Sequence, residues 1–225
     1  MPAGLEIYND AGTVQLDASS VTHTLVASGA AASGPKQYQF GNSTANITYT
    51  GTAPLLAFRP GSGDAALMQT SVSGNTHTWT INCSGAVGTP IEYWIFDMVP
   101  LGTLGYGIEI YNEVGSLVYA TQSKPIRVID LLQSSTYWGA VGPNVSYPVS
   151  KVAALFARQS GRRVWLRQGT TNIFLEQQYT MAVASAAPNN LSFRELLSGQ
   201  ATSSSLQTAI TFGASSVVIL DVSNY

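Results

Sequence analysis

Short runs in which apolar and polar residues alternate recur along the whole chain, and they are rich in β-branched and aromatic side chains. Alternation with a period of two is typical of β-strands with one buried face. Gly, Asn, Pro and Ser separate the runs, as turns require. The clearest runs are residues 5–8, 78–81, 91–96, 108–111, 125–129, 163–166, 173–175 and 217–220. The pattern predicts a mostly β protein with antiparallel β-sandwich architecture and little helix.

Two local patterns predict specific connections. Ser160-Gly161 lies between apolar runs, and residues 169–172 precede another run, so residues 152–176 are expected to form a meander of hairpins. Ser192 and Glu195 have the spacing of a helix capping box and are followed by two leucines and then Gly199. This segment is the main helix candidate, with one or two turns.

The most informative feature is an internal repeat. Residues 4–14, Gly-Leu-Glu-Ile-Tyr-Asn-Asp-Ala-Gly-Thr-Val, return without a gap at residues 107–117 as Gly-Ile-Glu-Ile-Tyr-Asn-Glu-Val-Gly-Ser-Leu. Both copies predict a strand, a tight turn and an antiparallel returning strand, with Asn9 or Asn112 entering the turn and Gly12 or Gly115 taking positive φ. A useful hairpin arising twice by chance is the alternative, but matching over so many consecutive positions favours a duplication.

The repeat suggests a division of the chain near Gly102. Residues 1–102 and 103–225 would then form two related sandwich-like units, each of ordinary size for such a domain; one continuous double sandwich is the alternative. The first segment has a formal net charge of −4 and the second of +2. Opposite signs would help to orient docking halves or successive copies.

The composition restricts the classes of function. With 45% hydrophobic residues the chain can bury a large core, but only 10% of its residues are charged and its net charge is −2. Such a weak field does not favour nucleic-acid binding. Residue Cys83 is the single cysteine, so no intramolecular disulfide is expected. No apolar run is long enough to cross a bilayer, and the N-terminus lacks the basic region of a signal peptide, so we expect synthesis in the cytoplasm and no membrane insertion.

Candidate chemistry is sparse. The close acidic pairs, Glu6 with Asp10 and Glu109 with Glu113, lie in the repeated hairpin. A glycosidase needs two carboxylates at a suitable separation, but turn and strand-surface roles explain these residues without catalysis. His23 and His77 stand in Thr-His-Thr triplets as strand residues, and Cys83 has no basic neighbour that would make it a nucleophile. The sequence therefore predicts no enzyme, no cofactor and no metal site.

Two groups of residues are candidates for binding. Tyr137 and Trp138 lie in a loop-like stretch and either stack on sugar rings or plug the core. Four arginines surround the Ser160-Gly161 turn and either contact an anionic surface or neighbouring subunit or form a solvated hairpin tip. These arginines are Arg158, Arg162, Arg163 and Arg167.

The repeated hairpin resembles a segment of small β-rich structural proteins of tailed bacteriophages and prophages. The segments Glu-Tyr-Trp-Ile-Phe-Asp at residues 92–97 and Lys-Pro-Ile-Arg-Val at residues 124–128 flank the second copy and share in the resemblance, which covers residues 1–20 and 90–130. It implies a virion protein of the tail tip, baseplate or fibre attachment, present in several copies and contacting other tail subunits, with a role in adhesion to host-surface polysaccharide. A carbohydrate-binding adhesin module, a capsid decoration protein and an enzyme acting on surface polysaccharide are the alternatives.

Overall fold

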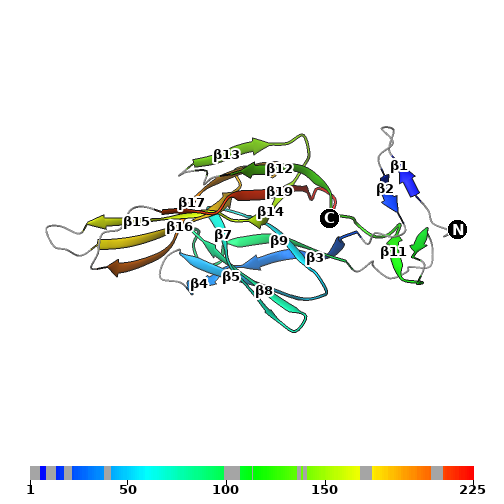
Figure 1. The fold of residues 1–225 in the computed structure, drawn as a ribbon, viewed down its shortest axis with the longest axis horizontal. Helices are drawn as coiled ribbons and strands as arrows, with labels where there is room; N and C mark the ends of the chain where they lie inside the picture. The colour runs from blue at the N-terminus through cyan, green and yellow to red at the C-terminus, as the bar shows by residue number, and fades with distance from the viewer. Residues whose placement is uncertain are drawn as a thin grey trace.

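The computed structural model describes residues 6–8, 14–17, 22–37, 42–98, 107–112, 114–135, 138, 141–167, 174–203 and 210–225. Within these ranges the chain forms nineteen strands and no helix. Two large antiparallel sheets share a core, and two small hairpins lie at one end of the molecule (Figure 1). The mostly β, sandwich-like fold predicted from the alternating pattern is confirmed.

The first large sheet has six strands in the order β12-β19-β14-β6-β9-β3, and every neighbouring pair is antiparallel. Its edge strands approach each other at one end, where a bridge joins Thr24 to Pro125 and the Ile126 amide donates to the His23 carbonyl. The six strands are β3 (Thr24–Ala32), β6 (Leu55–Pro60), β9 (Pro90–Asp97), β12 (Val128–Ser134), β14 (Val152–Arg158) and β19 (Ser215–Asp221).

The second large sheet has nine strands, of which seven follow the order β13-β17-β16-β7-β8-β5-β4, while β15 pairs with β16 and β18 pairs with β15. These strands are β4 (Gly34–Pro35), β5 (Ser43–Thr50), β7 (Asp64–Ser73), β8 (Thr76–Cys83), β13 (Val141–Ser146), β15 (Gly161–Arg167), β16 (Phe174–Ala184), β17 (Asn190–Ser203) and β18 (Ile210–Phe212). The far part of β16 and β17 extends with β15 beyond the sandwich, on the left of Figure 1. We call β15, β18 and the paired segments 174–178 and 199–203 the arm.

The repeated segments form the two hairpins at the opposite end of the molecule, on the right of Figure 1. Strand β1 (Glu6–Tyr8) pairs with β2 (Val14–Asp17), and β10 (Glu109–Tyr111) pairs with β11 (Leu117–Ala120). Every pairing of the first hairpin recurs in the second at an offset of 103 residues, including the register shift before Tyr8 and before Tyr111. The predicted strand, turn and returning strand are confirmed.

The duplication extends beyond the hairpins to the whole topology. After its hairpin, each half places strands in turn in the six-stranded, nine-stranded, six-stranded, nine-stranded, nine-stranded and six-stranded sheets. In the first half these strands are β3, β5, β6, β7, β8 and β9; in the second they are β12, β13, β14, β16, β17 and β19. Strand β4 is an addition in the first half, and β15 and β18 are additions in the second.

The pairing registers of the edge strands β3 and β12 show the same correspondence between the two halves. Leu25 pairs with Phe96 and the next residue is skipped, just as Val128 pairs with Leu220 and the next residue is skipped. Leu25 and Val128 are again 103 positions apart. The repeat seen in the hairpins therefore continues into the edge strands with its irregularity in the same place.

The two halves meet at the centre of both sheets. Strand β6 pairs with β14 through Phe58 and Ala154, and β7 pairs with β16 through Ala65 and Val183. The sheets are thus continuous across the division at residue 102, and the described strands of the two halves share one sandwich. This is the arrangement of an isologous dimer within a single chain.

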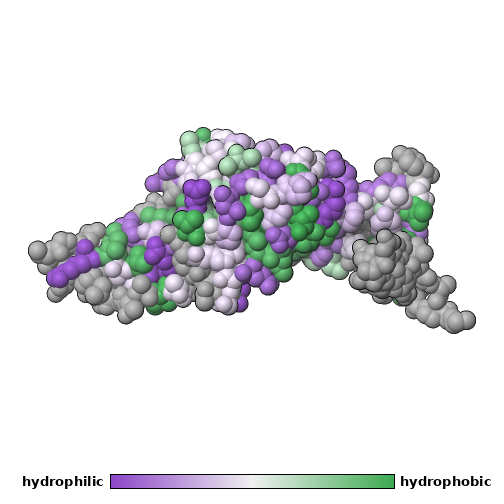
Figure 2. All heavy atoms as spheres, turned by 90° about the horizontal axis from the view of Figure 1, so that it is seen from above, coloured by the Kyte–Doolittle hydropathy of each residue, from purple (hydrophilic) through white to green (hydrophobic). Residues whose placement is uncertain are grey.

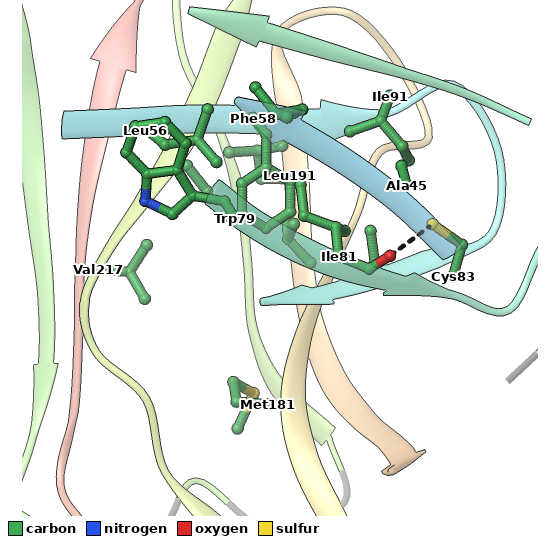
Figure 3. Close-up of a cluster of buried hydrophobic side chains, with 14 of the residues drawn as sticks. Ala45, Leu56, Phe58, Trp79, Ile81, Cys83, Ile91, Met181, Leu191 and Val217 are labelled. Carbon is green, nitrogen blue, oxygen red and sulfur yellow. Dashed lines mark hydrogen bonds between the residues drawn. The ribbon is translucent and has the colours of Figure 1, made fainter. Parts of the chain in front are cut away.

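Aromatic stacking marks the junction. Phe58 on β6 and Phe156 on β14 occupy corresponding positions in the two halves. Phe58 lies two residues after the partner of Ile95 on β9, and Phe156 lies two residues after the partner of Ile219 on β19. Ile95 and Ile219 are equivalent, because each stands one residue before the partner of Leu25 or of Val128. Their rings stack with centroids 5.6 Å apart and an interplanar angle of 27°. Phe58 is fully buried in the core between the sheets, where Trp79 and Leu191 surround it from the opposite sheet (Figure 3).

A second apolar cluster lies on the other face of the six-stranded sheet. Along β9, Ile95 belongs to the central core, whereas Trp94 and Phe96 belong to this second cluster. The C-terminal Tyr225 packs edge-on against Phe96 and lies below the Arg127 guanidinium. Both faces of the six-stranded sheet are therefore apolar, which explains the nearly uninterrupted hydrophobic runs in β9 and β14.

Arg59 ties the two halves together by polar contacts. It is almost fully buried on β6, donates to the carbonyls of Pro188 (2.8 Å) and Ala187 (3.2 Å) in the β16–β17 turn, and also donates to Ser185. Its Nε lies 3.4 Å from Glu92, which also accepts from Lys151 at 2.8 Å. Burial lowers the pKa of Arg59, while the Glu92 charge acts in the opposite direction.

Two local predictions were wrong. Residues 192–199 form part of β17 instead of a helix: Phe193 and Leu196 are buried, and the strand pairs along its length with β16. Glu195 forms an ion pair with Arg162 instead of capping a helix. The capping spacing is a short local signal, and burial of this segment between two strands outweighs it.

The Ser160-Gly161 segment is not a hairpin turn. Strand β14 pairs with β6 and β19 in the six-stranded sheet, whereas β15 pairs with β16 and β18 in the other. The chain therefore crosses between sheets here, and the Ser160 hydroxyl hydrogen-bonds with the Ser215 hydroxyl. The second predicted hairpin, β15 with β16, is confirmed by their pairing from Gly161–Thr180 to Arg167–Phe174.

Truncation of the junction residue should destabilise the whole chain. Phe58→Ala is expected to lower the free energy of unfolding by about 3–5 kcal/mol, because it leaves a cavity where the two halves meet. Urea denaturation followed by tryptophan fluorescence measures this change. Val72→Ala, at an exposed position of β7, should change it by less than about 0.5 kcal/mol. Equal effects of the two substitutions would contradict the role given to Phe58.

Removal of the Arg59 guanidinium should also be costly. Arg59→Met keeps the length of the side chain but removes the charged donor to the Pro188 and Ala187 carbonyls and one of the two cationic partners of Glu92, so we expect a loss of about 1.5–3 kcal/mol. The same denaturation measurement applies, with the exposed Arg158→Met as the control. A loss below about 1 kcal/mol would mean that this contact does not join the halves.

Candidate interaction surfaces

The turn of the second hairpin is built by one asparagine and one glycine. The Asn112 side-chain oxygen accepts from the Ser116 amide at 2.8 Å and from the Val114 amide at 3.2 Å. Gly115 has φ of +79°, a conformation that favours glycine. The predicted roles of Asn112 and Gly115 are confirmed, while Asn9 and Gly12 lie outside the described residues.

The second hairpin has a buried side and an exposed apolar side. Val118 and Ala120 are fully buried on β11, whereas Ile108 is 63% and Val114 84% exposed. Tyr111 is also exposed and donates its hydroxyl to Glu109. That hydrogen bond raises the pKa of Tyr111, so the phenol stays neutral well into the alkaline range. The hairpin thus presents large apolar side chains at the end of the molecule.

The arm carries exposed apolar and basic residues. Arg163 and Arg167 lie on one face of β15 because four positions separate them, and Leu166 lies on the other. All three are exposed, as is Ile210, which stands opposite Arg163 on β18. Figure 2 shows hydrophobic and hydrophilic residues interspersed along this extension, on its left side.

The structure separates the four arginines that the sequence groups together. Arg158 is exposed at the end of β14 and belongs to the other sheet. Arg162 is half-buried, forms an ion pair with Glu195 and lies over the Tyr179 ring at 4.9 Å. Burial raises the pKa of Glu195. Only Arg163 and Arg167 are therefore exposed together on the arm, and both also interact within the chain.

Trp138 is partly buried and packs against the core. The rings of Trp138 and Phe193 meet edge-on, with centroids 5.5 Å apart. Trp138 also lies close to Gly142: a Cβ atom placed on this glycine would be 3.2 Å from Cε3 of Trp138. This placement corresponds to the core-plug alternative for Trp138. Tyr137 lies outside the described residues.

A small pocket of about 440 Å³ opens where β13 and β17 lose regular pairing between Val141 and Asn144. Its polar lining is already engaged: Asn190 donates to Asn144 at 2.9 Å, and Arg194 pairs with Asp64 at 3.0 Å. Burial raises the pKa of Asp64, and the Arg194 charge opposes this shift. The groups at this pocket mainly join strands to one another.

The residues with potential chemistry have structural partners. His23 lies 3.1 Å from the Ala53 carbonyl, and His77 stacks on Trp79 with centroids 5.8 Å apart. Glu109 is the one member of the repeated acidic pairs whose side chain the structure describes, and it accepts from Tyr111. Among the described residues no three His, Cys, Asp or Glu side chains gather as metal ligands would.

Two further polar contacts give no signal in the sequence. Asp97 is fully buried and accepts from the amides of Thr52 and Ala53, each at 2.9 Å, and so fixes the loop before β6. Tyr147 donates to Asp130 at 2.6 Å, which with burial raises the pKa of Tyr147. These partners are distant in sequence, so no local spacing announces them.

Comparisons of the chain with protein-family models, curated proteins and solved structures found no match. In the part of the chain that the structure describes, no helix has the length and apolar character needed to cross a membrane.

The buried Cys83 thiol gives a pH-dependent prediction. Burial raises its pKa to about 11, although a hydrogen bond with Ser43 acts in the opposite direction. Since the thiol ionises more readily in the unfolded chain, stability from this residue is complete below pH 9 and is lost as pH rises towards 11. The native chain should therefore resist a thiol reagent at about pH 8 and react fully in urea. Rapid native labelling would contradict this burial, with Cys83→Ser as the blank.

Proposed function

We propose that this chain is a non-enzymatic structural subunit of a tailed-phage particle, present in several copies at the tail tip, baseplate or fibre attachment. It assembles by docking its hairpins, arm and strand edges on neighbouring subunits, and many weak contacts together hold it in place. The hairpin resemblance supplies the phage context, and the exposed apolar hairpin supports assembly.

The hairpin supports this proposal most directly. Two-stranded sheets are marginal by themselves in water, yet both copies of the repeat form one at the end of the molecule. The second copy exposes Ile108 at its open end, Tyr111 on β10 and Val114 at its turn. Large exposed apolar groups gathered on a projection are characteristic of a docking surface.

An edge strand adds a second surface of this kind. Strand β12 ends the six-stranded sheet and exposes Val128, Ile129 and Leu131. A sheet edge with apolar side chains readily accepts another strand, and an assembly subunit would have it covered in the particle.

The proposed location is tested by immunogold electron microscopy of purified virions from a phage or lysogen that carries this gene. We expect label at the distal end of the tail. Particles lacking the gene are the negative control, and an antibody shown to bind the folded chain is the positive control. Label on the head would move the role to the capsid, and unlabelled particles would overturn the virion assignment.

A further inference from the structure

The two ends of the molecule differ in charge. Segments 1–22 and 103–123, which contain the two hairpins, hold five acidic residues and no lysine or arginine. The remainder of the chain holds seven acidic and ten basic residues. The two segments are therefore strongly acidic for a chain with so few charges.

Two of these acidic residues hold paired positions in the first hairpin. Glu6 and Asp17 stand directly opposite each other in the register of β1 and β2. Like charges at facing positions destabilise a two-stranded sheet.

The opposite end provides matching groups. Arg163 and Arg167 are exposed on one face of the arm, next to the exposed Ile210. A guanidinium has five donors, so contacts within the chain leave capacity for a carboxylate of another molecule. In the second hairpin Glu109 follows the exposed Ile108 in the chain, and Val114 is exposed at the turn, so acidic and apolar residues at this end correspond to basic and apolar residues on the arm.

The two surfaces cannot meet within one molecule, because the sandwich lies between them in Figure 1. We propose that the arm of one copy binds the hairpin end of a second copy, with Arg163 and Arg167 placed against the acidic hairpins. This inference rests on the proposed assembly function and specifies its contact. Because the two surfaces differ, the contact is head-to-tail, and it generates a ring if the rotation closes and a filament if it does not.

Charge reversal in the full-length chain tests the contact. Sedimentation velocity over a range of concentrations should show oligomers of the unaltered chain that dissociate when NaCl is raised from about 0.1 M to about 0.5 M. The variants R163E/R167E and E6K/D17K should each raise the concentration needed for assembly by about tenfold or more. The variant K36E/R158E carries the same charge change as R163E/R167E at exposed positions outside the arm and should assemble normally.

Mixing the two reversed variants is the decisive step. Each alone places like charges at the contact, but an acidic arm and a basic hairpin restore attraction, so an equimolar mixture should regain the oligomers. Circular dichroism melting curves must match those of the unaltered chain. A monomer at every concentration, or reversed variants that assemble as well as the unaltered chain, would overturn the contact. Virion labelling is independent of these results and separates a wrong contact from a wrong location.

Discussion

The pairing of β6 with β14 is the constraint on which the rest of the structure depends. It joins two halves of equivalent topology, and the stacked Phe58 and Phe156 rings fill the core at the same point. A half containing three strands in each sheet would leave its central strands as apolar edges, which expose unpaired amides and carbonyls. Joining the halves pairs these edges with each other and doubles the core that each sheet covers. The duplication therefore stabilises both halves, because neither is left with an unpaired apolar edge at its centre.

Polar contacts then fix how the joined halves sit. Hydrophobic contact alone tolerates sliding, whereas buried donors need acceptors at defined positions. Arg59 meets this need across the junction through the Pro188 and Ala187 carbonyls. At the end of β9, Asp97 accepts hydrogen bonds from the loop before β6. At the end of β19, burial acts to raise the pKa of Asp221, but the hydrogen bonds from Ser223 and the charge of Arg127 outweigh it and lower this pKa. The sandwich core is thereby a rigid scaffold that carries projections at both ends.

The projections differ in origin and in what could be predicted of them. The hairpins repeat a short local pattern whose turn chemistry, Asn112 and Gly115, can be read directly from sequence. The strands of the arm also alternate visibly, but the crossing at Ser160 depends on which sheet buries each strand, and that is a long-range property. The same reason explains why Ser192 and Glu195 suggested a helix: their spacing is local, whereas the pairing of β17 is not. Arg59 gives no signal at all, since its hydrogen-bond acceptors in the β16–β17 turn lie more than 120 positions away.

The central claim is that both halves form one cooperative sandwich. Native-state hydrogen exchange of the full chain at increasing denaturant tests it most directly, because it measures the free energy of opening strand by strand. We predict that core amides of β6 and β9 in the first half and of β14 and β19 in the second exchange through the same global opening, with one free energy and one denaturant dependence. Two distinct values, divided between residues 1–102 and 103–225, would contradict the account and show that the halves fold as separate domains.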